Sequence, residues 1–218
     1  PYHGLANRMT DDLQKLQANQ LAQTTAEAVA IAQGLGDTVV VVGLSMGGVA
    51  TAWAAQNLPG ITHAVLISPA LGPGGVPTWL VPPLMRALIR LPNFYMWWSR
   101  KLKEAVPGAI QTYPRFPSHA LANAYRLGIE VLDDDAPPQT RSMAVVASDS
   151  DLGINHAMTA ELIARWRAHG ASVEPYQYGK SERVQHDMVD PSQPDQQVAK
   201  VYPLLIKVID RIVPAPNP

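Results

Sequence analysis

The fold is decided by residues 39–48, which read Val39-Val40-Val41-Val42-Gly43-Leu44-Ser45-Met46-Gly47-Gly48. Four consecutive valines are typical of a strand that is buried on both faces, as in a parallel sheet. The next stretch, 49–57, is rich in alanine and predicts a helix that ends near Pro59-Gly60. Ser45 therefore lies on a sharp turn that leads from a strand into a helix.

A serine at such a turn has the surroundings of a nucleophile. We expect Gly43 and Gly47 to relieve crowding against neighbouring backbone, so that the hydroxyl of Ser45 projects from the carboxyl end of the sheet. The positive end of the helix and the backbone N–H of Met46 then face any oxyanion that forms there. Gly-x-Ser-x-Gly alone also arises by chance, because tight turns need glycine. The prediction of a nucleophile elbow therefore depends on the strand before the motif and the helix after it.

Three segments together resemble the α/β-hydrolase superfamily, and in particular its carboxylesterase and monoacylglycerol-lipase branch. They are Gly43–Gly48 after the valine run, the alanine-rich helix, and Ala64-Val65-Leu66-Ile67-Ser68-Pro69-Ala70. The resemblance covers most of the chain and is most specific around Ser45. It implies an α/β-hydrolase fold, with a mostly parallel sheet flanked by helices and a helical cap insertion. It also implies a catalytic order of serine, acid and histidine, with no cofactor.

The acid and the base are expected in the loops after later strands. Asp149 and Asp151 both follow the predicted strand 142–148, and the family pattern, an acid just before a hydrophobic residue, favours Asp151 over Asp149. His186 is the only histidine after the predicted strand 172–178, and the 35 residues between Asp151 and His186 leave room for one helix and one strand. The sequence therefore predicts a triad of Ser45, Asp151 and His186, with the Met46 N–H as one oxyanion donor.

Strands and helices alternate along the rest of the chain, which favours a parallel sheet with crossover helices. We expect helical segments in 11–33, a strand at 61–68, a helix at 157–169, and a last helix at 194–213 that Pro203 kinks or divides. The hydrolase core is predicted to comprise 1–71 and 136–218, and the cap 72–135. The aromatic and methionine side chains of the cap either line an acyl-chain pocket or form the core of the cap itself. They include Trp79, Met85, Phe94, Tyr95, Met96, Trp97 and Trp98.

The beginning of the sequence is unusual. It opens on Pro1, and Tyr2-His3-Gly4-Leu5 resembles the loop that follows the fourth strand in the family. In family members the first three strands and the loop with the second oxyanion N–H lie upstream of that point. We therefore expect a chain that lacks its first strands and whose sheet has an open, apolar edge.

Composition narrows the function further. With 218 residues, 47% hydrophobic residues and a net charge of −1, the chain fits one globular domain and is not a typical nucleic-acid binder. Cysteine is absent, which excludes disulfides and thiol chemistry, and no apolar run is long enough to span a membrane. The histidines lack the spacing of metal ligands, and Asp133-Asp134-Asp135 lacks the spaced oxygens of a calcium loop, so no metal is expected.

The predicted partner is a small acyl ester, because an apolar cap favours acyl chains over polar substrates. A thioesterase, an amidase, an acyltransferase or a cofactor-free haloperoxidase would use the same three residues. A non-catalytic binding protein on a degenerate hydrolase fold is a further alternative. The sequence does not decide the oligomeric state or the compartment, although it slightly favours the cytoplasm.

Overall fold

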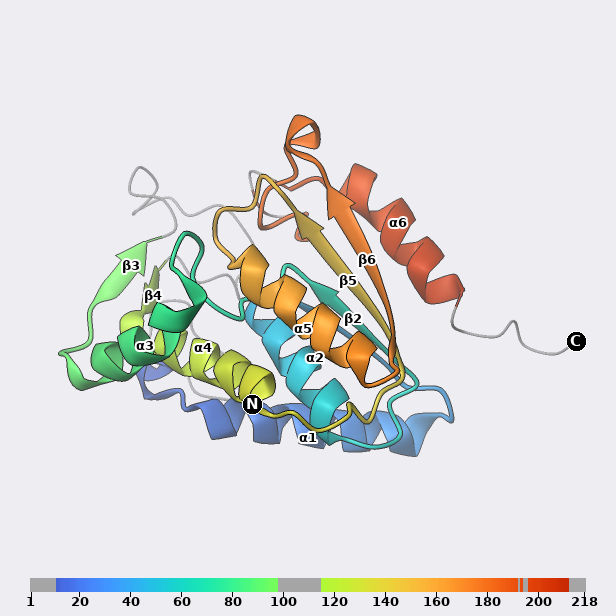
Figure 1. Ribbon diagram of the computed structural model, residues 1–218, viewed down its shortest axis with the longest axis horizontal. Helices are drawn as coiled ribbons and strands as arrows, with labels where there is room; N and C mark the ends of the chain where they lie inside the picture. The colour runs from blue at the N-terminus through green and yellow to red at the C-terminus, as the bar shows by residue number, and fades with distance from the viewer. Residues whose placement is uncertain (1–10, 98–114, 192, 194–195, 212–218) are drawn as a thin grey trace, which may run out of the picture.

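The computed structural model describes residues 11–97, 115–191, 193 and 196–211, and a parallel sheet lies at its centre (Figure 1). Its four strands pair in the order β1-β2-β5-β6, and every pairing is parallel. The strands are β1 (Val40–Leu44), β2 (His63–Ile67), β5 (Ser142–Ser148) and β6 (Ser172–Tyr178). The predicted parallel sheet is thus confirmed. The valine run continues as a strand through Gly43 and Leu44 up to the serine.

Helices cover both faces of the sheet. On one face lie α1 (Ala18–Leu35), α2 (Met46–Asn57) and α5 (His156–Ala168), and the short helix η1 (Asp12–Lys15) precedes α1. On the other face lies α6 (Val198–Asp210). The alternation of strand side chains explains the two layers, because Leu66 packs with α2 and α5 whereas Val65 and Ile67 pack with α6. Among the described residues α6 is one continuous helix with Pro203 inside it, and it begins later than the predicted residue 194.

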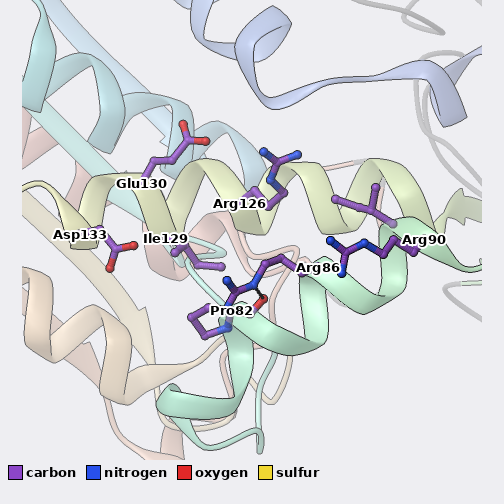
Figure 2. A pocket seen from close by; sticks show the side chains of 8 residues that line it. Pro82, Arg86, Arg90, Arg126, Ile129, Glu130 and Asp133 are labelled. Atoms are coloured by element: carbon purple, nitrogen blue, oxygen red, sulfur yellow. Dashed lines mark hydrogen bonds between the residues drawn. The ribbon is translucent and has the colours of Figure 1, made fainter.

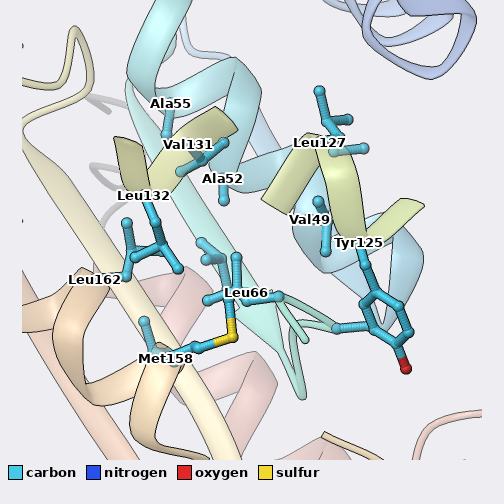
Figure 3. Close-up of a cluster of buried hydrophobic side chains, with 14 of the residues drawn as sticks. Val49, Ala52, Ala55, Leu66, Tyr125, Leu127, Val131, Leu132, Met158 and Leu162 are labelled. Atoms are coloured by element: carbon cyan, nitrogen blue, oxygen red, sulfur yellow. The ribbon is translucent and has the colours of Figure 1, made fainter. Parts of the chain in front are cut away.

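In the described part of the segment between β2 and β5 lie two α-helices, a short 3-10 helix and a small ribbon. It comprises η2 (Thr78–Leu80), α3 (Val81–Arg90), the antiparallel pair β3 (Tyr95–Trp97) and β4 (Arg115–Pro117), and α4 (Ser118–Asp133). Leu127 and Val131 of α4 belong to the same buried cluster as Val49 of α2 (Figure 3). A Cβ atom on Gly128 would lie 2.9 Å from Cα of Leu71, so α4 packs directly on the loop after β2.

These contacts show how the predicted cap is connected to the core. We retain 72–135 as the proposed cap insertion, but its last helix belongs to the hydrophobic core around α2. The side chains grouped at the sequence level also differ in their surroundings, since Met85 is buried in that core whereas Trp79 and Phe94 are exposed. Trp98 and the Tyr2-His3-Gly4-Leu5 segment lie outside the described residues. No described helix is long and apolar enough to cross a membrane.

Candidate active site

The candidate site is built around the turn between β1 and α2. Ser45 adopts φ 56° and ψ −114°, a conformation that is strained for a residue with a side chain. Backbone hydrogen bonds hold it there, because its N–H donates to the carbonyl of Ile67 at 2.9 Å and its carbonyl accepts from the N–H groups of Val49 and Ala70, each at 3.1 Å. The sharp turn predicted from the sequence is therefore tied to the neighbouring strand as well as to its own helix.

The structure corrects the expected roles of the glycines at this turn. A Cβ atom on Gly43 would overlap the carbonyl group of Gly47 and lie 2.5 Å from Oγ1 of Thr51. A Cβ on Gly48 would lie 2.9 Å from Cα of Pro69, whereas a Cβ on Gly47 meets no described atom within 4 Å. Gly43 is thus needed for close approach, as predicted. The second crowded position is Gly48 rather than Gly47, because Gly48, the third residue of α2, faces the end of β2.

Ser45, His186 and Asp151 form a continuous chain of hydrogen bonds. Nε2 of His186 lies 2.8 Å from Oγ of Ser45, and Nδ1 of His186 lies 2.7 Å from Oδ2 of Asp151. The side chain of Asp151 is fully buried and that of His186 is 19% exposed. Parallel strands end at the same edge of a sheet, so the loops after β1, β5 and β6 bring the three residues together there. With the proton on Nδ1, the imidazole can accept the serine proton at Nε2.

Asp151 is held as a carboxylate by its surroundings. Burial opposes its ionisation, but the hydrogen bond and charge of His186, the hydroxyl of Ser68 and the N–H of Gly153 together lower the pKa of Asp151. The Gly153 N–H donates to Oδ1 at 2.9 Å. Ser68 has φ 41°, and its buried hydroxyl forms no hydrogen bond of ordinary geometry with the described residues, so its effect on Asp151 is that of a nearby dipole.

The pKa of His186 is shifted in the opposite direction to that of Asp151. Burial alone would lower the pKa of His186, but the hydrogen bond and charge of Asp151, with the charge of Asp187, outweigh it and raise the pKa. Asp151 therefore stabilises the imidazolium that forms when His186 takes a proton.

Asp149, the alternative acid, lies elsewhere. Its exposed side chain accepts a hydrogen bond from Nε2 of Gln177 at 2.8 Å, whereas the hydrogen bonds of the His186 ring go to Asp151 and Ser45. His156, at the start of α5, has its Nε2 2.8 Å from the carbonyl of Asp151 and so fixes the backbone of the acid. No role in the site was predicted for His156. Its position five residues after Asp151 and just after a helix-capping Asn155 was the available signal.

Tyr125 of α4 is a second neighbour that sequence reasoning missed. Figure 3 shows its hydroxyl directed away from the labelled apolar side chains of the cluster. Burial and the negative charge of Asp151 raise the pKa of Tyr125 to about 12, so the hydroxyl stays protonated at working pH. No sequence motif marks this residue, because an aromatic side chain on an apolar helix face is usually part of the core.

The Met46 N–H is the first amide of α2, and no hydrogen bond joins it to another described residue. It is therefore free to donate to an oxyanion at the positive end of the helix. The second donor predicted upstream remains a prediction. The arrangement as a whole places a hydroxyl, an imidazole, a buried carboxylate and an amide N–H at the start of a helix in one site, and these groups are suited to acyl transfer.

Comparisons with known proteins agree with the fold. A model described as the alpha/beta hydrolase family matches residues 1–201, while no curated protein matches the chain significantly. A structure described under LipS and LipT, two metagenome-derived lipolytic enzymes, has a TM-score of 0.62 at 18% identity, with 91% of this chain and 76% of that chain covered. A monoacylglycerol lipase of Paleococcus ferrophilus has a TM-score of 0.62 at 14% identity, with coverages of 86% and 74%. A soluble variant of monoglyceride lipase from Saccharomyces cerevisiae has a TM-score of 0.65 at 12% identity, with coverages of 90% and 69%.

Proposed function

This chain belongs to the α/β-hydrolase family, and on that premise we propose that it is a serine hydrolase that cleaves carboxylic esters. The observation that carries the proposal is the pair of hydrogen bonds, 2.8 Å and 2.7 Å long, that link Ser45 through His186 to Asp151. A binding protein needs neither the strained serine nor the buried carboxylate. Strain of this kind persists where the surrounding structure enforces it, and it concentrates at active sites.

Acylation begins when Oγ of Ser45 attacks the ester carbonyl carbon while Nε2 of His186 takes the hydroxyl proton. The carbonyl oxygen becomes an oxyanion that accepts a hydrogen bond from the Met46 N–H. Asp151 keeps the imidazole in the required tautomer and stabilises its charged form. When the bond from the carbonyl carbon to the alcohol oxygen breaks, His186 gives its proton to the leaving alcohol. An acyl group then remains on Ser45.

Deacylation repeats these steps with water as the nucleophile. His186 takes a proton from the water while the water oxygen attacks the acyl carbon, and it returns that proton to Oγ of Ser45 as the acid departs. The net reaction consumes one ester and one water and releases one alcohol and one acid. All proton transfers involve groups of this chain, so the proposed reaction uses no cofactor.

An ester is the proposed substrate for two reasons. The family includes many triad enzymes, and the structures cited above that share this fold are named as lipolytic enzymes and monoacylglycerol lipases. The segment 72–135 also offers apolar side chains such as Leu88 and Ile89, which pack at the edge of the buried cluster. Thioesters and amides are the competing substrates, because the same steps would cleave them.

Labelling with a fluorophosphonate, followed by intact-mass measurement, tests the proposal. Activated Ser45 should displace fluoride and gain one adduct, and Ser45→Ala should gain none. Ser150→Ala is the matched control, because Ser150 lies in the acid loop and its hydroxyl donates to the carbonyl of Lys180 at 3.4 Å rather than to His186. It should label like the parent chain. Absence of an adduct on a folded parent chain would contradict the serine-hydrolase proposal and favour a binding protein.

Turnover of matched esters, thioesters and amides with the same acyl chain then tests the substrate class. Ester hydrolysis should be fastest and should disappear in Ser45→Ala. Faster cleavage of the thioester or the amide would overturn the ester proposal while leaving the nucleophile in place.

A further inference from the structure

Two loops that are distant in the sequence are joined beside the candidate active site. One is the acid loop, residues 149–155, which leads from β5 to α5. The other comprises residues 72–76, where the proposed cap insertion begins. An isolated antiparallel bridge pairs Pro73 with Ile154, so the backbones of the two loops run against each other. The position of the catalytic acid therefore depends on a segment that belongs to the proposed cap.

Gly153 connects this pairing to the triad. Its carbonyl accepts a hydrogen bond from the N–H of Gly74 at 3.3 Å, and its own N–H donates to Oδ1 of Asp151 at 2.9 Å. A Cβ atom on Gly153 would lie 3.2 Å from Oδ1 of Asp151 and 3.6 Å from Nδ1 of His186. The backbone thus lies directly against the acid and the base. A shift of Gly153 would therefore move the carboxylate relative to the imidazole.

Asn155 makes the largest number of links between the two loops. Its side chain and backbone are buried, and its N–H donates to the carbonyl of Gly72 at 2.9 Å. Its side-chain Nδ2 donates to the carbonyls of Val76 at 2.7 Å and Pro73 at 3.5 Å. Its Oδ1 accepts from the N–H of Met158 at 3.2 Å and caps α5. The amide nitrogen therefore joins the loops, whereas the amide oxygen begins the helix.

The 72–76 loop is a firm anchor because the core packs around its start. Leu71 is completely buried, and a Cβ atom on Gly72 would overlap Sδ of Met158. The loop leads through η2 into α3, which lies beside α4, and residues of both helices line the groove between them (Figure 2). A group that is tied to this loop consequently has little freedom to move.

We propose that Asn155 is a positioning residue of the hydrolase. Its amide nitrogen holds the acid loop against the 72–76 loop and thereby keeps Asp151 within hydrogen-bonding distance of His186. The hydrogen bonds of Asn155 go to backbone groups, so it acts on the triad through the backbone of the loop. A misplacement of about 1 Å in a catalytic group can slow a reaction about 100-fold. This role rests on the proposed function, because it concerns the same three catalytic residues.

Two substitutions separate this role from helix capping. Asn155→Ser keeps a side-chain oxygen for the N–H of Met158 but loses the amide nitrogen, and Asn155→Ala loses both. The rate of fluorophosphonate labelling per folded molecule compares them with the parent chain. We expect both variants to label about tenfold or more slowly, because both lose the link between the loops. Asn155→Ala should also unfold at a lower urea concentration than Asn155→Ser, because only the alanine variant loses the cap.

The pH dependence of labelling reports on the acid itself. Asp151 raises the pKa of His186, so a loosened carboxylate lets that pKa fall toward its ordinary value. In both Asn155 variants the decline of the labelling rate on the acid side should therefore occur at lower pH than in the parent chain. The charge of Asp187 also raises this pKa and is unchanged in the variants, so the shift should not exceed that of Asp151→Asn.

Trp166→Phe is the matched control. It removes one buried hydrogen bond, 2.6 Å long, from Nε1 to Oε1 of Gln56, and it lies toward the other end of the same helix. It should keep the labelling rate and the pH dependence of the parent chain. An equal slowing in Trp166→Phe would overturn the positioning role, because general loosening of α5 would then explain the effect.

Two other results would also overturn it. If Asn155→Ser labels like the parent while Asn155→Ala is slow, the cap rather than the link between the loops controls the acid. If both variants label like the parent, Asn155 does not position Asp151, and the proposed function still stands. A folded parent chain that does not label would instead contradict the proposed function, and the positioning role would fail with it.

Discussion

Replacing the glycines of the nucleophile turn one at a time should separate crowded from open positions. In Gly43→Ala the new methyl group would overlap the Gly47 carbonyl, a backbone group that cannot rotate away. Overpacking of this kind costs about 3 kcal/mol or more of unfolding free energy. In Gly48→Ala the methyl group would lie 2.9 Å from Cα of Pro69. A small shift between α2 and the loop after β2 can relieve this contact, so the cost should be about 1–3 kcal/mol.

Gly47→Ala should have the opposite sign. No described atom lies within 4 Å of the added methyl group, and Gly47 is in helical conformation in the first turn of α2. Alanine restricts the unfolded chain and favours the helix, so the variant should be more stable by about 0.5–1 kcal/mol. The difference between Gly43→Ala and Gly47→Ala is then about 4 kcal/mol, which at a slope of about 2 kcal/mol/M is about 2 M in the urea midpoint.

Urea unfolding followed by circular dichroism measures the series, and the rate of fluorophosphonate labelling reports the position of Ser45. Gly43→Ala should slow labelling even where it remains folded, whereas Gly47→Ala should label like the parent chain. A Gly47→Ala variant that is destabilised as much as Gly43→Ala would refute the reasoning, because it would mean that the second motif glycine, not Gly48, is the crowded one.

Three further predictions concern the acid, the base and the core. Asp151→Asn should lower kcat by about 10⁴-fold while Asp149→Asn changes it little, as steady-state ester hydrolysis would reveal. The pKa of His186 is raised from its ordinary value of 6.5, so the imidazole becomes neutral at a higher pH than a free histidine does. We therefore expect kcat/KM to rise with pH through and beyond 6.5. In Asp151→Asn, the decline of the fluorophosphonate labelling rate on the acid side should occur at lower pH than in the parent chain. An unchanged pH dependence would show that a group other than His186 controls the rate. Trp166→Phe removes the 2.6 Å hydrogen bond from Nε1 to Oε1 of buried Gln56 and should cost about 1–3 kcal/mol in thermal or urea unfolding, without changing the labelling rate per folded molecule.

Local patterns were sufficient for the sheet, whereas the order of the site residues was predicted from the resemblance to the α/β-hydrolase superfamily. Runs of buried β-branched and alanine residues predicted β2 and β5 within two residues of their ends, because central strands of a parallel sheet are apolar on both faces. The bounds of β6 were predicted from an alternating pattern instead, and only some of its side chains are buried. The convergence of Ser45, Asp151 and His186 followed from topology alone. Residues that follow parallel strands emerge at one edge of the sheet, whatever the details of their loops.

Tertiary packing decided between alternatives that local sequence patterns could not distinguish. Asp149 and Asp151 lie two residues apart in one loop, and only the direction of each side chain places Asp151 on His186 and Asp149 on Gln177. An apolar helix stripe looks the same whichever partner it meets, so the sequence could not show that α4 packs on α2 while Trp79 faces outward.

The glycines of the turn follow the same rule. Gly47 belongs to the Gly-x-Ser-x-Gly motif and Gly48 directly follows it, but the space around each depends on where the end of β2 and Pro69 lie, which is a long-range property of the fold. Short-range periodicity and chain order were enough to predict the strands of the central sheet and the edge at which the reactive groups lie, but not the ribbon of β3 and β4. Packing between segments that are distant along the chain decided which of Gly47 and Gly48 is crowded. For the acid, the resemblance to the α/β-hydrolase superfamily already favoured Asp151, and the structure places that side chain beside His186.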